Sequence, residues 1–301
     1  MYIGHLECYE KGSEMAEMLM GVKVSDSTIY RLTDAVGEAA KDVIDSEGVR
    51  KEITLDAGEH LYVQVDGSML LTRSDGWKET KLGRIFKSSS LMAESESRRW
   101  IKESEYVGHL GDHEEFENLM SKLIDEPYRK NEEQIVFVGD GARWQWSWAE
   151  AEYPKSIKIL DFYHAMEHIG KYLKIAKRNK REVDKMMNKL GHILKVKGVA
   201  TVERYIEKIP RKTKTQNEQY CKLRIYINNN RTKMDYPSYI KKGYLIGSGA
   251  IESAHRTVLQ KRMKQSGQRW TISGLSNMIK LRTASMSGYW NEIQSIIRKS
   301  A

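Results

Sequence analysis

The sequence predicts an α/β protein: a mixed five-stranded sheet with flanking helices, a large all-helical insertion and a helical N-terminal segment. Short apolar runs with strand-like alternation recur between residues 61 and 160, separated by helix-like stretches. Residues 1–50 and 162–245 instead repeat apolar positions at helical spacing. We therefore expect four regions: a helical segment over 1–50, an α/β core whose first part is 55–161, a helical insertion over 162–245, and closing helices over 246–301.

Size and charge narrow the class of protein. A chain of 301 residues with 40% hydrophobic content can bury a substantial core, and its length suggests about two domains. No apolar run approaches the roughly 18 residues of a membrane span, and the start lacks the blocks of a signal peptide. The formal net charge of +9 favours a polyanionic partner. We expect a cytoplasmic protein, nucleoid-associated when bound to DNA, with no membrane partner.

The N-terminal segment reads as two helices. Residues 14–20 form the first, Gly21 marks a turn, and Ser25 is placed to cap a second helix. On that second helix Thr28 and Arg31 face outward, as in the recognition helix of a helix-turn-helix, and are candidate DNA contacts. The opposite face is expected to pack through Ile29, Leu32 and Val36. A plain helical hairpin fits the same pattern, and the two readings stay open.

The core shows three strands, a helix, a fourth strand, a helix and a fifth strand. The strands are expected at 61–65, 81–86, 106–110, 135–138 and 157–160, and the helices at 116–123 and 143–152. This succession is that of an RNase H-like, integrase-type domain. Helical patterns broken near Pro210 and residues 228–232 follow, which predicts the helical insertion.

Three carboxylates stand at the ends or starts of these elements. Asp66 ends the first alternating apolar run, Asp140 follows the fourth strand, and Glu252 opens a basic amphipathic helix. Two strand ends and a helix start can converge, and oxygen ligands suit two Mg²⁺ or Mn²⁺ ions acting in phosphodiester displacement. Each residue also has a structural alternative: Asp-Gly is a common turn signal, and a first-turn Glu often answers the helix dipole.

Basic residues are concentrated directly after Glu252. Beside a metal-binding carboxylate they would neutralise phosphates, although such a run is often only a solvated face. Trp270 could stack on an unpaired base, or simply belong to the core. The DNA-binding candidates here are Arg256, Lys261, Arg262, Lys264, Arg269 and Trp270.

Several motifs together resemble a known family. They are Val65-Asp-Gly-Ser-Met, Val138-Gly-Asp-Gly-Ala-Arg-Trp, Asp161-Phe-Tyr-His164, Gly247-Ser-Gly-Ala-Ile-Glu-Ser-Ala-His and Gln260-Lys-Arg-Met-Lys-Gln-Ser-Gly-Gln-Arg-Trp. From about residue 15 onward the chain looks like the bacterial insertion-sequence DDE transposases with a helical insertion, relatives of the Mutator-like element transposases. The resemblance implies an RNase H-like core, two divalent metal ions, and cleavage and joining of transposon ends.

Carried over residue by residue, the resemblance assigns the catalytic, metal-binding triad to Asp66, Asp140 and Glu252. It places Asp161 and His164 near the site, where a hydrogen-bonded core histidine is favoured over a metal ligand for His164. The implied partners are transposon-end and target DNA, bound by a homodimer or larger assembly. The start looks clipped relative to the family. A structure-specific, resolvase-type nuclease and a truncated non-catalytic DNA-binding relic are the alternatives.

Overall fold

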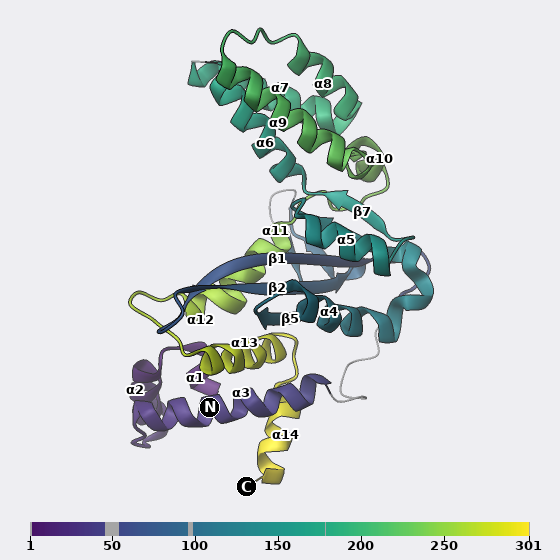
Figure 1. The fold of residues 1–301 in the computed structure, drawn as a ribbon. Helices are drawn as coiled ribbons and strands as arrows, with labels where there is room; N and C mark the ends of the chain where they lie inside the picture. The colour runs from purple at the N-terminus through teal and green to yellow at the C-terminus, as the bar shows by residue number, and fades with distance from the viewer. Residues whose placement is uncertain (1, 46–53, 96–98, 178, 301) are drawn as a thin grey trace. The chain divides into compact units, whose positions relative to one another are not determined.

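The computed structural model describes residues 2–45, 54–95, 99–177 and 179–300 (Figure 1). It is an α/β protein, as predicted, with a five-stranded mixed sheet in the order β5-β2-β1-β6-β7 and a separate two-stranded sheet, β3-β4. The chain divides into two compact units, residues 1–135 with 249–301, and residues 136–248. The predicted boundary between residues 50 and 55 falls on 46–53, which lie outside the described residues.

Three strands of the five-stranded sheet belong to the first unit. They are β1 (Leu61–Leu71), β2 (Trp77–Lys87) and β5 (Glu105–Leu110), paired antiparallel. Apolar side chains of the expected alternating runs are buried, because β-branched and aromatic residues pack well on a pleated surface. A short hairpin, β3 (Leu91–Ala93) and β4 (Arg99–Ile101), follows the 3₁₀ turn η1 (Ser88–Ser90) and was not predicted.

Helix α4 (His113–Tyr128) covers part of this sheet and ends in the 3₁₀ turn η2 (Arg129–Gln134). Its apolar face carries Phe116 and Met120, both fully buried, as its helical spacing predicts. The helix approaches β2 closely at Gly83, where an added Cβ would lie 2.2 Å from the Met120 sulfur. Glycine at this position therefore sets the distance between helix and sheet.

The N-terminal helices are α1 (Tyr2–Leu6), α2 (Tyr9–Met20) and α3 (Asp26–Asp45). Gly21 ends α2 in the left-handed region with φ 67°, and the Ser25 hydroxyl accepts a hydrogen bond from the Thr28 amide at 3.2 Å, so the turn and the cap were predicted correctly. Leu32 is a correction, since it is 45% exposed. Thr33 takes the core position instead, because its hydroxyl is satisfied by donating to the Ile29 carbonyl.

The closing part of the first unit is helical (Figure 1). It runs through α11 (Gly249–Ala254), the π-helical turn η4 (His255–Gln260), α12 (Lys261–Met263), α13 (Ile272–Met286) and α14 (Trp290–Ser300). Helix α13 contacts both α3 and β5. The contact with α3 is tight at Gly37, where a Cβ would meet the Asn277 carbonyl oxygen at 2.5 Å. These helices and the sheet share one apolar core around Leu70, Leu82 and Val258.

The second unit begins within a parallel pair of strands and continues as helices. Strand β6 (Ile135–Gly139) leads through α5 (Arg143–Glu152) to β7 (Ile157–Leu160). The insertion then contains α6 (Phe162–Ala176), α7 (Lys180–Lys197), α8 (Val199–Glu207), α9 (Lys214–Asn230), the 3₁₀ turn η3 (Arg231–Lys233) and α10 (Tyr236–Lys241). The expected break at residues 228–232 starts later than predicted, because α9 continues to Asn230. Among the described residues, no helix is long and apolar enough to cross a membrane.

Candidate active site

Asp66 lies in the middle of β1, not at its end. The strand continues to Leu71, with Asp66 opposite Leu82 of β2 and Gly67 opposite Lys81. The sequence predicted that the strand ends at Asp66, or that Asp66 and Gly67 form a turn. Both predictions are wrong, because β2 supplies pairing partners on both sides of this dipeptide. The carboxylate is 36% exposed and its Oδ1 accepts a hydrogen bond from the Gly67 amide at 2.7 Å. A rigid strand thus presents a partly exposed carboxylate.

Glu252 lies in the first turn of α11, and two hydrogen bonds fix that turn to the sheet. The Ile251 amide donates to Oε1 of the fully buried Gln64 at 3.0 Å, and Arg84 Nη1 donates to the Ala250 carbonyl at 2.7 Å. Gln64 belongs to β1 and Arg84 to β2. Glu252 itself is exposed. Its backbone is therefore held beside the strand that carries Asp66, while its carboxylate remains accessible.

His255 is a site residue that the sequence reasoning missed. Its Nε2 lies 3.5 Å from Asp66 Oδ2, and its ring is buried. Burial lowers the pKa of His255 to about 4, and the charge of Lys264 lowers it further, while the nearby Asp66 backbone partly opposes this shift. The imidazole is therefore neutral at pH 7. Its spacing of three residues from Glu252 on a helix was the signal available in the sequence.

The helix carrying these residues changes its winding at His255. Residues His255–Gln260 form a π-helical turn between the α-helical turns of α11 and α12. Such turns are rare and occur often at functional sites, since the wider winding repositions side chains along the helix. Here the wider turn begins at the residue that contacts Asp66.

Asp140 directly follows β6 in the second unit and opens the turn into α5. Its Oδ1 accepts a hydrogen bond from the Ala142 amide at 2.9 Å, and Gly141 has φ 100°, a conformation open to glycine. Burial raises the pKa of the Tyr226 hydroxyl, and the negative charges of Asp140 and Asp161 raise it further. Tyr226 therefore stays protonated near Asp140, and its distance of 86 residues in the sequence concealed this from sequence reasoning (226 − 140).

Asp161 has a structural role. It is almost fully buried, its Oδ1 accepts from the His164 amide at 2.6 Å to cap α6, and its Oδ2 accepts from the Ser248 amide. Both oxygens are thereby occupied. The His164 side chain is 40% exposed, with Nε2 3.9 Å from Glu167, which corrects the expectation of a core histidine. His164 lies in the first turn of α6, where its backbone amide, and not its ring, is bonded to Asp161.

The donor chemistry of the site suits hard cations. Asp66 and Glu252 offer carboxylate oxygens, the ligands that Mg²⁺ and Mn²⁺ prefer. Within the described ranges, no three His, Cys, Asp or Glu side chains are grouped so that they could hold a metal ion. The structure thus places Asp66, Glu252 and His255 around neighbouring elements of the first unit, and Asp140 in the second.

Most of the candidate DNA-binding side chains are on the surface. Thr28 is partly exposed, and the exposed ones are Arg31, Arg256, Lys261, Lys264 and Arg269. Arg262 is a correction, because it is fully buried. Its Nε donates to the Gly4 carbonyl at 3.0 Å, and its guanidinium lies 4.6 Å from the Tyr9 ring centre and 5.0 Å from that of Trp270. It stabilises contacts with α1 and cannot reach phosphates.

Trp270 likewise belongs to the core. Only 5% of its surface is exposed, and its Nε1 donates to the Met263 carbonyl at 3.2 Å. Its backbone is tied to β1, since the Trp270 amide donates to the Leu71 carbonyl and the Arg73 amide donates to the Trp270 carbonyl. The prediction that Trp270 belongs to the core is confirmed. The alternative, that its indole is exposed and stacks on a base, is wrong.

Comparison with known proteins defines the family. The model of an uncharacterised protein family, UPF0236, matches residues 5–298. The chain belongs to UPF0236. One UPF0236 relative, described as "UPF0236 protein in vanSb 3'region" from Streptococcus gallolyticus, is 27% identical over 290 residues. The match covers 93% of this chain and 60% of the relative, so the chain spans about 60% of the length of that UPF0236 protein.

Proposed function

We propose that this protein is a DDE transposase, a metal-dependent enzyme that cleaves and joins DNA strands at the ends of an insertion sequence. The observation that carries the proposal is the setting of Asp66. This carboxylate projects from the middle of a paired strand, 3.5 Å from a buried imidazole that follows Glu252 on the helix fixed to that strand. The backbone of Glu252 and the strand that carries Asp66 are held together by hydrogen bonds, and this supports the pre-organisation that metal-dependent phosphoryl chemistry requires.

In this proposal, acidic residues bind metal ions and basic residues bind phosphates. Asp66 and Glu252 would hold divalent cations, and Asp140 is assigned to the same task by its Gly-Asp-Gly motif. Two Mg²⁺ or Mn²⁺ ions held by these residues would supply the positive charge that favours attack on a phosphodiester and departure of its leaving oxygen. His255, being neutral, adds no positive charge that would repel a cation beside Asp66. The exposed side chains of Lys261 in α12 and of Lys264 directly after α12 would hold phosphates next to the cleaved bond.

The reaction joins two steps at one centre. Water attacks the phosphodiester at the element's end, and the released 3′-hydroxyl then attacks a phosphodiester of the target, which displaces a new 3′-hydroxyl there. Two element ends must be held together for this reaction, so a homodimer or larger assembly on DNA belongs to the proposal.

A nicking assay tests the proposal. The parent is expected to nick a supercoiled plasmid carrying the DNA that flanks the reading frame, in Mg²⁺ or Mn²⁺ and not in chelator. Asp66→Asn, Asp140→Asn and Glu252→Gln are each expected to abolish nicking, because an amide is a poorer ligand for a hard cation. Glu114→Gln removes an exposed carboxylate from the first turn of α4 and serves as the matched control. A triad variant that nicks at the parental rate removes that residue from the site.

A joining assay separates the transposase from its rivals. A transposase is expected to insert a pre-cut, labelled oligonucleotide with a free 3′-hydroxyl into plasmid DNA. A resolvase-type, RNase H-like nuclease would cut without joining, and a non-catalytic relic would bind DNA without cutting. Either of these outcomes contradicts the transposase proposal.

A further inference from the structure

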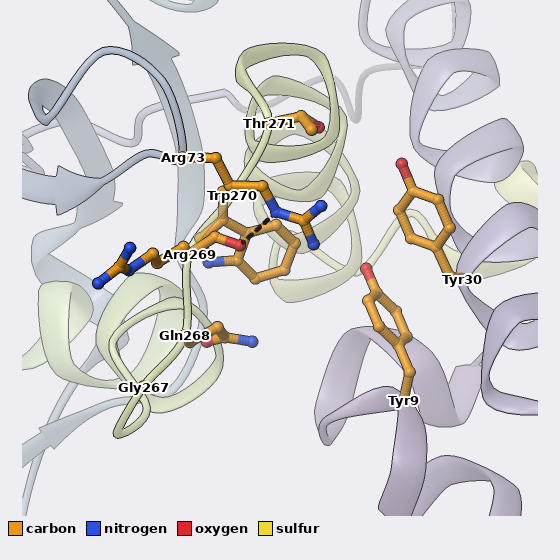
Figure 2. A pocket seen from close by; sticks show the side chains of 8 residues that line it. All are labelled: Tyr9, Tyr30, Arg73, Gly267, Gln268, Arg269, Trp270 and Thr271. Atoms are coloured by element: carbon orange, nitrogen blue, oxygen red, sulfur yellow. Dashed lines mark hydrogen bonds between the residues drawn. The ribbon is translucent and has the colours of Figure 1, made fainter.

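A cavity of about 380 Å³ lies in the first unit, away from Asp66 (Figure 2). Its walls come from four segments: Tyr9 at the start of α2, Tyr30 on α3, Arg73 just after β1, and the loop that leads into α13. That loop contributes Arg269 and Trp270. Nothing described so far for the nicking reaction uses this cavity.

The cavity is rigidly built on one side. The loop before α13 is tied to the end of β1 by the Arg73 amide, which donates to the Trp270 carbonyl at 2.8 Å, and by a parallel bridge between Thr72 and Trp270. Arg73 Nε also donates to the Arg269 carbonyl at 3.4 Å. This bond uses Nε and leaves the two terminal nitrogens of Arg73 for another acceptor. In Figure 2 the Arg73 guanidinium points toward the tyrosine hydroxyls, whereas the Arg269 guanidinium turns away.

Positive charge dominates the cavity. Arg73 and Arg269 are both exposed, and no Asp or Glu is among the lining residues, all of which the structure describes. Outside the lining, the negative charge of Asp34 acts on Tyr9 and raises its pKa, so the two exposed arginines outnumber this carboxylate. Behind the lining, the buried Arg262 guanidinium lies against the rings of Tyr9 and Trp270. A buried cation in a low-dielectric setting acts strongly on a nearby charge. An anionic group of a ligand is therefore favoured here.

The tyrosine rings of the lining can contact a flat group of a ligand. Tyr9 and Tyr30 are partly exposed, their ring centres lie 5.4 Å apart, and their planes are tilted by 69°. Burial raises the pKa of Tyr9 to about 12, so its hydroxyl remains a hydrogen-bond donor at neutral pH. Figure 2 shows both hydroxyls directed to the Arg73 side of the cavity. A flat, polar-edged group can rest on a tyrosine ring and receive these hydrogen bonds.

The volume of the cavity limits the size of a ligand that has both a flat ring and an anionic group. The volume of about 380 Å³ lies at the lower end of the range of about 300 to 1,000 Å³ for small-molecule sites. It suits one nucleotide and excludes the paired bases of a duplex. A base stacked on an aromatic side chain beside an arginine-bound phosphate is the usual arrangement in proteins that bind single strands.

We propose that this cavity binds one unpaired nucleotide of DNA, with its phosphate on Arg73 and its base against the ring of Tyr30 or Tyr9. Arg269, which turns outward from the same loop, would hold the phosphate of the adjoining nucleotide. The inference rests on the proposed function in taking DNA as the source of the nucleotide. It adds to that function a place for a base that has left the duplex near a cleaved end.

Binding to a short labelled oligothymidylate, measured by anisotropy in chelator, tests the site. Tyr30→Leu keeps apolar volume but removes the ring, and should weaken single-strand binding roughly five- to 150-fold, which corresponds to about 1 to 3 kcal/mol for one stacked base. Tyr30→Phe keeps the ring and should bind nearly as the parent does. Arg73→Gln should weaken binding and flatten its salt dependence, whereas Lys78→Gln, an equal loss of charge at the exposed start of β2, is the control.

Further arms identify the ligand. Binding to the same sequence as a duplex should change little in the Tyr30 and Arg73 variants. Thymidine monophosphate should compete far more weakly than the oligonucleotide if the source is a DNA strand, and equally well if it is a free nucleotide. The nucleotide site is overturned if Tyr30→Leu and Arg73→Gln, folded by circular dichroism, bind the single strand as tightly as the parent. It is also overturned if single-strand and duplex binding fall together.

The two proposals can fail separately. Because binding is measured without divalent cations, it does not depend on nicking. Asp66→Asn should retain parental single-strand affinity, so loss of nicking in that variant leaves the nucleotide site intact. Conversely, a parent that nicks and joins DNA while its Tyr30 and Arg73 variants bind normally supports the transposase and refutes the nucleotide site.

Discussion

At the scale of single residues, the pairing of Asp66 with His255 shapes the site. A cationic imidazole would lower the pKa of a neighbouring carboxyl group. Burial instead keeps the His255 imidazole neutral, with a pKa of about 4. The 3.5 Å between Nε2 and Oδ2 therefore reflects contact between an anion and a neutral ring. Such a neighbour can orient the carboxylate without cancelling its charge, which suits a residue meant to bind metal.

His255→Leu is expected to reduce metal-dependent nicking about ten- to one-hundred-fold, the usual effect of losing a group that orients a metal ligand. The metal concentration for half-maximal rate should rise, since Asp66 loses its positioning partner. His255→Gln restores a polar side chain and should recover part of the rate. Equal rates in His255→Leu and the parent, at limiting Mg²⁺, would show that the contact is only packing.

Triad substitution should separate stability from activity. Asp66→Asn and Glu252→Gln are expected to leave the thermal midpoint unchanged or slightly higher in the absence of metal, because like charges no longer repel. Differential scanning calorimetry in chelator measures this midpoint, with Glu114→Gln as the control. A large fall in either variant would mean that the carboxylate has a structural role, as Asp161 does.

At the scale of elements, the run from α11 through η4 to α12 has two different faces. Ile251, Ala254 and Val258 are buried in the core, whereas Lys261 and Lys264 are exposed. Arg262, between those lysines, points into the protein. Sequence alone could not separate the three basic residues, because the partners of Arg262 are the carbonyl of Gly4 and the ring of Tyr9, more than 250 residues away.

Replacing Lys261 and Lys264 together by Gln should therefore weaken binding to all DNA sequences. If both contact phosphates, the slope of log K against log salt should fall by up to about 1.8, at about 0.9 for each contact. Lys11→Gln with Lys78→Gln, both exposed in the same unit, controls for net charge. An unchanged slope in the Lys261 and Lys264 variant would move the phosphate contacts to another surface.

Helix α3 carries the prediction about sequence recognition. Arg31 is exposed and Thr28 partly so, while Ile29 and Val36 are buried on the opposite face. If α3 is a recognition helix, Arg31→Ala should reduce discrimination between element ends and random DNA by about 1 to 3 kcal/mol, with little effect on total binding. Competition binding measures the ratio, and Lys11→Ala is the matched control. Full discrimination by Arg31→Ala would leave α2 and α3 as a packing hairpin.

At the scale of the whole molecule, most elements could be predicted and their boundaries less well. All five strands of the larger sheet were predicted, because their alternating or continuous apolar runs are distinctive. The prediction ended β1 too early at Asp66, since Asp-Gly is also a turn signal and the pairing strand that overrides it is not local. Arg262 was misjudged and His255 was missed, because burial depends on distant partners.

The pH dependence of stability also belongs to the whole chain. Burial and the charge of Arg282 lower the pKa of His5 to about 4, as burial does for His255. In the unfolded chain both titrate near 6.5, so below that pH the unfolded state binds more protons and stability falls until about pH 4. Each should cost about 2 kcal/mol at pH 5 relative to pH 7.

Urea unfolding at pH 7 and pH 5 measures this loss. His255→Gln and His5→Gln should each show a smaller difference between the two pH values than the parent. His192→Gln, on the exposed face of α7, is the control and should keep the parental difference. A parental difference in the two buried-histidine variants would show that other groups govern the acid sensitivity.

Two buried arginines constrain the order of folding during synthesis. Arg262 and Arg282 donate to the carbonyl oxygens of Gly4 and His5, so α1 obtains these contacts from residues made more than 250 positions later. On the ribosome, residues 136–248 emerge as one uninterrupted stretch and can condense before the first unit is complete. Until the closing helices are made, the helices and strands of the first unit expose the apolar faces that those helices will cover. Chaperones should therefore stay bound longer to nascent chains stalled before residue 262 than to chains that extend well beyond residue 282.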